Sequence, residues 1–198
     1  MRLDHLAIAA ETLEDGVAWA EDRLGVSFQL GGKHTRYATH NRLLGLADGL
    51  YLEVIAVDPD ATSDGARWFG LDTFAGPPRL VNWICETKDF DDFMFYGMRK
   101  VAMERGDLRW DIGVPFDGSL PMEGGFPTIL QWYTDTPPGC SLAPSGCALS
   151  FLTIFHPQAD DIKHILKGYL TDPRVRFEVA PNIWLNADFK TPGGVVKL

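Results

Sequence analysis

The feature that most constrains the fold is a strand–helix–strand–strand–strand (βαβββ) pattern that occurs twice along the chain. Alternating apolar positions predict a strand at 3–9, and apolar residues at helical spacing predict a helix at 13–24. Further strands are predicted at 26–30, 39–46 and 50–57, with turn residues between them. The second copy has a strand at 80–86, a helix at 89–104, and strands at 112–116 and 128–133, which matches the first copy except for one strand.

The positions of polar residues inside these strands repeat as well. The offset of 77 positions that superimposes the two helices also aligns His5 with Asn82. From the first to the fourth strand the chain runs 48 residues to Glu53 in the first copy and 49 residues to Gln131 in the second. A carboxylate in an apolar strand is costly to bury unless it is paired, bound to a metal or facing a wet pocket. The repeat marks all four residues as candidate site residues. The alternative is that Glu53 is exposed to solvent, while His5, Asn82 and Gln131 are hydrogen-bonded within the core.

A third, shorter unit follows, with strands at 148–155, 177–179, 183–189 and 195–198 and a helix at 158–170. An apolar residue, Phe151, takes the position of His5, so this unit is predicted to be degenerate. Segments rich in Gly and Pro separate the units, which divides the chain into 1–58, 79–134 and 147–198. The expected fold is α+β, in one compact structure.

Charge and motifs exclude several classes of protein. The chain has 18 Lys and Arg against 27 Asp and Glu, a net charge of −9, which argues against nucleic-acid binding. Its longest charge-free stretch, 136–155, is broken by Pro and Gly, so no membrane partner is expected. The three cysteines form no Cys-x-x-Cys pair and no signal-like segment is visible, which favours free thiols in the cytoplasm. Dinucleotide, Walker-type, serine-hydrolase and His-Glu-x-x-His motifs are absent.

Candidate ligand-binding residues lie in and near the third strand. Thr39 and Asn41 share one strand face, and we predict that this face points towards a ligand, with His34 at the mouth of the site. A polar outer face with a solvated loop is the alternative. Trp83 and Trp132 are candidates for an apolar pocket wall, although plain core packing is the more common role for such residues.

Three short motifs, in order, link the chain to a family. They are Asp4-His5-Leu6, Gly-x-His-x-x-x-Ala-Thr-x-Asn-x-Leu beginning at Gly32, and Tyr51-Leu52-Glu53. Together they resemble the glyoxalase-like domain proteins of the vicinal oxygen chelate (glyoxalase/bleomycin resistance/dioxygenase) superfamily, and the resemblance spans essentially the whole chain. It implies two βαβββ modules that form a cupped mixed sheet around a pocket, with the third, degenerate module alongside; which two modules pair stays open.

The resemblance also implies a site. In this superfamily the first and fourth strands of each module hold a divalent metal, which here assigns His5, Glu53 and Gln131 as ligands of Mn, Fe, Zn, Ni or Mg. Asn82 is a poor ligand and is assigned to substrate binding with His34, Thr39, Asn41, Trp83 and Trp132. Two neutral amides weaken the ligand set.

The function this site predicts is that of a metal-assisted lyase, isomerase or dioxygenase acting on a small oxygenated molecule, with Glu53 as a catalytic residue. The alternative is a metal-free protein that sequesters a small molecule. A third hypothesis is an interaction module that forms a homodimer through its strand edges.

Overall fold

The computed structural model describes the backbone of residues 1–198 and all side chains except those of residues 94–96. The strands are β1 (Arg2–Ala9), β2 (Gln29–His34), β3 (Thr39–Leu46), β4 (Tyr51–Val57), β5 (Arg79–Glu86), β6 (Met98–Arg105), β7 (Leu108–Pro115), β8 (Thr128–Trp132), β9 (Pro144–His156), β10 (Val175–Val179), β11 (Trp184–Thr191) and β12 (Gly194–Lys197). The α-helices are α1 (Leu13–Leu24), α2 (Pro138–Ser141) and α3 (Ala159–Leu166), and short 3₁₀ helices include η1 (Thr35–Tyr37), η3 (Trp68–Gly70), η4 (Phe90–Tyr96) and η5 (Pro121–Gly124).

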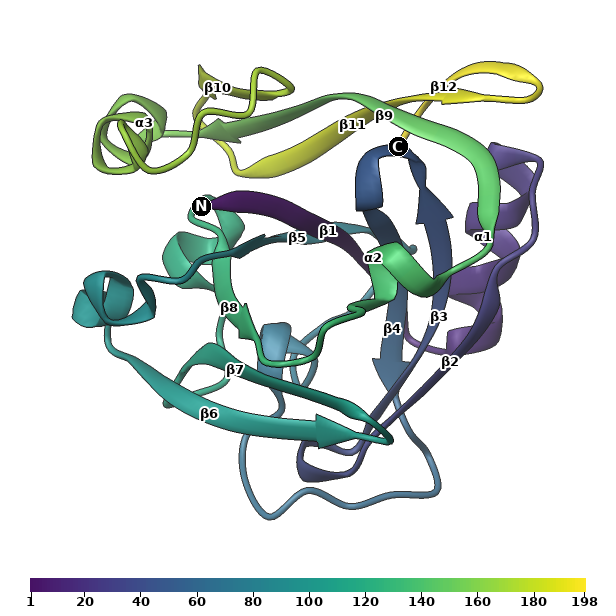
Figure 1. Ribbon diagram of the computed structural model, residues 1–198, viewed down its shortest axis with the longest axis horizontal. Coiled ribbons are helices and arrows are strands. Elements are labelled where there is room, and N and C mark those ends of the chain that lie inside the picture. Colours follow the sequence, from purple (N-terminus) through teal and green to yellow (C-terminus); the bar gives the residue numbers. More distant parts are fainter.

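Two modules with the same strand order build one curved sheet. In the first, β4 pairs in parallel with β1 and continues antiparallel to β3 and then β2; in the second, β8 pairs in parallel with β5 and continues to β7 and β6. The first strands of the two modules, β1 and β5, pair antiparallel and join them. The sheet curls so that β2 at one end contacts β6 at the other (Figure 1). This is the predicted mixed α+β fold with cupped modules.

Helix α1 forms where the sequence predicts it. The Oγ1 atom of its N-cap residue Thr12 accepts a hydrogen bond of 3.1 Å from the Asp15 N–H, and the helix ends at Gly25 with a left-handed φ of 70°. A Cβ atom on Gly16 would lie 2.6 Å from Val54 Cγ1, so a glycine at this position lets α1 pack directly on β4.

The predicted helix over 89–104 is wrong. Its first part forms η4, and Gly97, with φ 69°, ends that helix before β6 begins. Buried Val101 and Met103 alternate with exposed neighbours, as in a strand with one covered face, and Gly106 turns the β6–β7 hairpin instead of capping a helix. The second strand is also displaced, from the predicted 26–30 to 29–34.

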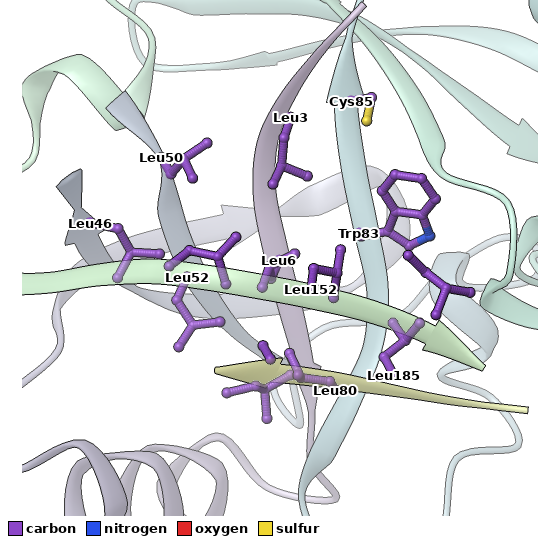
Figure 2. Packing of buried hydrophobic residues seen from close by; sticks show 14 of the residues in the cluster. Leu3, Leu6, Leu46, Leu50, Leu52, Leu80, Trp83, Cys85, Leu152 and Leu185 are labelled. Atoms are coloured by element: carbon purple, nitrogen blue, oxygen red, sulfur yellow. The ribbon is translucent and has the colours of Figure 1, made fainter. Parts of the chain in front are cut away.

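The C-terminal unit has a different strand order, as expected of a degenerate module. Here β10 pairs in parallel with β9 directly after α3, and β9 and β12 flank β11. Figure 1 shows this layer lying across β1 and β5. Its apolar side chains pack on the outer face of the curved sheet, where Leu152 and Leu185 meet Leu6 and Trp83 (Figure 2).

Two apolar clusters therefore lie on opposite faces of the curved sheet. The outer cluster, under α1 and the C-terminal layer, includes Leu6, Leu52 and Trp83. The inner cluster includes Ile84 and Leu130, together with aromatic residues of η3 and β7. Within the described part of the chain, no helix combines the length and the apolar character needed to cross a lipid bilayer.

Candidate functional site

The inner face of the sheet surrounds a small cavity of about 30 Å³. Polar and ionisable side chains of both modules meet apolar and aromatic ones around it. They are His5, His34, Asn41, Tyr51, Glu53 and Arg105, with Leu43, Trp68, Phe69, Trp110, Ile112, Leu130 and Trp132. A volume of this size holds about one water molecule.

A bulge in β1 brings two neighbouring side chains into contact. Leu3 pairs with Cys85 and His5 with Ile84, so Asp4 is an extra residue in the ladder with β5. Asp4 can therefore reach the same side as His5, and its Oδ2 atom lies 2.7 Å from His5 Nδ1. The other Asp4 oxygen accepts a 3.0 Å hydrogen bond from Trp132 Nε1.

Glu53 completes a buried array with His5. Its Oε2 atom lies 3.6 Å from His5 Nε2, and its Oε1 atom accepts a 2.5 Å hydrogen bond from Asn41 Nδ2. Burial lowers the pKa of His5, but the two carboxylates outweigh burial and raise it above its usual value. Burial raises the pKa of Glu53, yet His5 and the Asn41 amide bring it down to about 2. The array thus favours the imidazolium form of His5, which lies between the carboxyl groups of Asp4 and Glu53.

Asn41 is oriented by the glycines of β2. Its Oδ1 atom accepts a 2.7 Å hydrogen bond from the Gly32 N–H, which leaves the amide nitrogen to face Glu53. A Cβ atom on Gly31 would lie 2.1 Å from the same Oδ1 atom. Gly31-Gly32 is therefore part of the strand that supports the site, where the sequence alone suggested a strand end.

His34 is held neutral on the opposite side of the cavity. Its Nε2 atom lies 3.0 Å from Arg105 Nη1, and a guanidinium can only donate, so Nδ1 carries the proton and donates to Thr39 Oγ1 at 3.1 Å. Burial is the main reason that the pKa of His34 falls to about 4. The negative charge of Glu53 raises this pKa, and the positive charge of Arg105 lowers it further.

Aromatic rings close the site. Tyr51 stacks on the His5 ring with centroids 4.3 Å apart. On the side of the segment that joins β4 to β5, Trp68 stacks between Tyr37 at 4.4 Å and Phe69 at 4.9 Å. Trp68 Nε1 also donates a 3.1 Å hydrogen bond to Thr39 Oγ1. Phe69 has a left-handed φ of 59°, a conformation that bulky residues seldom adopt without tertiary support.

The structure brings most of the predicted site residues together. His5, Glu53, His34, Asn41 and Trp132 all line the cavity. Thr39 faces the same way as Asn41 but lies behind His34 and Trp68, to which it is hydrogen-bonded.

Three predicted residues lie elsewhere. Gln131 alternates with the cavity residues Leu130 and Trp132 and so points to the opposite face of β8; the expected convergence with His5 and Glu53 is wrong. Trp83 lies in the outer core, where Nε1 donates to the Gly124 carbonyl at 3.2 Å. Asn82 is fully buried and bonded to the Thr128 hydroxyl at 2.9 Å, away from the cavity.

Comparison with known families matches a glyoxalase-like domain over residues 3–170. The chain belongs to this family. The structure of a hypothetical protein from Staphylococcus aureus has the same fold, with a TM-score of 0.63, 12% identity, and coverage of 99% of this chain and 97% of that chain.

Methylmalonyl-CoA epimerases from Mycobacterium tuberculosis and Streptomyces coelicolor give TM-scores of 0.44 and 0.45 at 19% and 16% identity. They cover 66% and 69% of this chain and 86% and 99% of their own. No curated protein matches the sequence.

The donor atoms of this glyoxalase-like domain do not fit a resident divalent metal. Among the side chains that the structure describes, His5 Nε2 and Glu53 Oε2 are the two potential metal ligands that face each other across the cavity, while His34 Nε2 accepts a hydrogen bond from Arg105. No cluster of three His, Cys, Asp or Glu side chains suited to a metal occurs among the described residues. The guanidinium of Arg105 places a further positive charge at the same wall.

Several site residues of this glyoxalase-like domain have weak sequence signals. Tyr51 lies two residues before Glu53 on the same strand face, so the alternation of β4 could have identified it. Asp4 depends on the bulge, and Arg105 and Trp68 reach the cavity from distant segments. No local pattern marks Arg105 or Trp68 as part of the site, and Asp4 is marked only by the motif Asp4-His5-Leu6.

Proposed function

We propose that this protein is an isomerase or lyase that transfers a proton on a small oxygenated molecule, with His5 and Glu53 as its acid–base pair. The observation that supports this most is the buried Asp4–His5–Glu53–Asn41 array at a small cavity. Strongly perturbed ionisable groups gathered at a cavity are typical of catalytic sites. Family membership fits the proposal, although a fold of this kind serves many reactions.

The chemistry follows from the charges of the pair. Protonated His5, held by Asp4, donates its Nε2 proton to a carbonyl oxygen of the substrate. Ionised Glu53 accepts the proton from the adjacent carbon, which gives an enediol. Once the substrate oxygen takes the His5 proton, Glu53 loses its cationic partner and its pKa rises towards the range of a useful base. Glu53 then returns its proton to the former carbonyl carbon while neutral His5 takes the proton of the other enediol hydroxyl, which completes an isomerisation and restores both residues. Where the next carbon carries a leaving group, that group departs with the proton from Glu53 while His5 takes the same hydroxyl proton, which completes an elimination.

A metal-free binding protein is the second candidate. It is favoured by the pairing of His5, Glu53 and His34 with other protein groups at the cavity. Such a site suits retention of a ligand at least as well as turnover. The two candidates differ in whether a carbon-bound proton exchanges with solvent.

The test is exchange of carbon-bound protons in heavy water, followed by proton NMR on a panel of small α-hydroxycarbonyl compounds. We expect exchange with the wild type and a loss of about 10²–10⁴-fold in Glu53→Gln, the usual contribution of a general base. The matched control is Glu104→Gln, which neutralises a β6 carboxylate whose side chain is 77% exposed. Full activity in Glu53→Gln would refute the assignment, and saturable binding without exchange would favour the binding protein.

The same assay separates the metal-assisted alternative. It is repeated after treatment with a chelator and again with added Mn²⁺, Fe²⁺, Zn²⁺, Ni²⁺ or Mg²⁺. We expect the same rate in each case, because two facing donor atoms beside a guanidinium hold such ions poorly. Activity that appears only with one of these ions would restore the metal-assisted mechanism.

A further inference from the structure

A second cavity, of about 610 Å³, lies outside the aromatic wall of the site. Its lining comes from η1, from residues 62–66 of the segment that joins β4 to β5, and from the start of β6. We propose that this outer cavity binds an anionic group, a carboxylate or a phosphate, through Arg36 and Arg99. None of its lining residues takes part in the proton transfer proposed above, so the two proposals fail independently.

The charges of the outer cavity support an anionic ligand. Among the described residues, neither Arg36 nor Arg99 has a carboxylate within 4.0 Å, in a chain with 27 acidic residues. Asp64 is the one acidic side chain in the lining, so two guanidiniums outweigh one carboxylate there. A guanidinium presents several N–H donors in a plane, which matches the oxygens of a carboxylate or phosphate.

Two polar atoms on the residues of this cavity are buried without a partner. The hydroxyl of Tyr37 and the Nε atom of Arg99 have no hydrogen bond within the described part of the structure. Such atoms are rare in native proteins because leaving them unpaired costs stability. The guanidinium of Arg99 lies 5.5 Å from the Phe116 ring, a contact that holds its plane without using its N–H donors.

Hydroxyl groups and backbone complete the lining. Thr35 and Thr62 add further donors, while Ser63 Oγ already donates to the Gly65 carbonyl at 2.8 Å and orders the loop. The outer cavity therefore combines two fixed positive charges with neutral donors, and an anion with several oxygens satisfies both.

The outer cavity shares a wall with the inner one. Tyr37 lines the outer cavity and stacks at 4.4 Å on Trp68, which lines the inner cavity. Residues 62–66 are followed within the same segment by Trp68 and Phe69. An anion that orders residues 62–66 acts on the segment that closes the site.

The experiment titrates the protein with inorganic phosphate and, separately, with malonate at low ionic strength, followed by amide NMR and calorimetry. Malonamide is the neutral control. We expect shifts in residues 35–37 and 62–66 with at least one of the two anions and none with malonamide. Comparison of phosphate with malonate distinguishes a phosphate site from a carboxylate site.

Variants assign the binding to the two arginines. Arg36→Gln and Arg99→Gln should each weaken the affinity about tenfold or more, because each removes charge-assisted hydrogen bonds to the anion. Arg99→Lys, which keeps the charge, should lose less. The matched control is Arg109→Gln, since Arg109 is 51% exposed on β7 and pairs with Glu104 at 3.4 Å.

Three outcomes would overturn the proposal. The first is no saturable shift in the wild type with either anion, a result that needs no variant to fold. The second is equal affinity in Arg36→Gln, Arg99→Gln and Arg109→Gln. The third is an affinity that falls in Arg105→Gln while the two outer variants bind normally, because that pattern places the anion in the inner cavity.

Discussion

Acidification from pH 7 to pH 5 should destabilise the protein mainly through His34. The pKa of this residue is lowered from 6.5 to about 4 in the folded protein, so in this range the unfolded chain takes up a proton that the folded chain does not. A group with a lowered folded pKa contributes stability above its unfolded pKa and loses it as the pH falls. At pH 5 the pKa of His34 in the unfolded chain is about 1.5 units above the pH. At 1.36 kcal/mol per unit, the free energy of unfolding falls by about 2 kcal/mol.

The assay is urea unfolding of the wild type and of His34→Gln at several pH values between 7 and 5. The glutamine offers an oxygen that can accept from Arg105, and it has no proton to take up, so the variant should lose most of this pH dependence. His164→Gln, at an exposed histidine of α3, is the control and should keep the wild-type slope. An NMR titration in which His34 of the folded protein titrates near 6.5 would refute the reasoning, as would an unchanged slope in His34→Gln.

Three further predictions concern the buried Asp4–His5–Glu53–Asn41 array and the glycine that supports it. The pKa of Glu53 is lowered from 4.5 to about 2, so Glu53 contributes about 3 kcal/mol above pH 4.5 that is lost as the pH falls towards 2; Glu53→Gln should flatten this acid limb in urea unfolding, and an unaltered limb would contradict the assignment. Gly31→Ala should lower the melting temperature and the proton-exchange rate because its Cβ atom meets Asn41 Oδ1, whereas Gly193→Ala, whose Cβ atom would lie 3.7 Å from Thr191 Oγ1, should leave both unchanged. Asn41→Ala should cost about 1–3 kcal/mol in chemical unfolding because it leaves the Gly32 N–H and Glu53 Oε1 without partners, and a change near zero would show that water replaces the amide.

The parts of the fold that the sequence predicts well are those set by local periodicity. Alternation identifies β1, a nearly continuous apolar run identifies β4, and helical spacing with a cap at Thr12 and a stop at Gly25 identifies α1. In the second module, the predicted helix over 89–104 is wrong because apolar residues three and four apart also occur in β6, a strand that is covered on one face only. Hairpin pairing with β7, a tertiary effect, decides between the two.

At the site, a difference of one residue in the predicted spacing decides which side chain of β8 points into the cavity. The spacing of 48 from the first module, counted from Asn82, leads to Leu130, which lines the cavity; the spacing of 49 leads to Gln131, which points away. Asp4 escapes prediction for a related reason, since a bulge changes the alternation of β1. The unit boundaries, the homodimer and the cytoplasmic location stay predictions.

The small volume of the inner cavity has a kinetic consequence. Any ligand larger than about one water molecule must wait for Trp68, Phe69 or a neighbour to move before it can contact Glu53. Association then has a step whose rate does not depend on ligand concentration, so the observed binding rate should level off as ligand is added. The apparent affinity is also reduced by the fraction of molecules that are open. Stopped-flow binding over a range of ligand concentrations would therefore show this plateau in the observed rate.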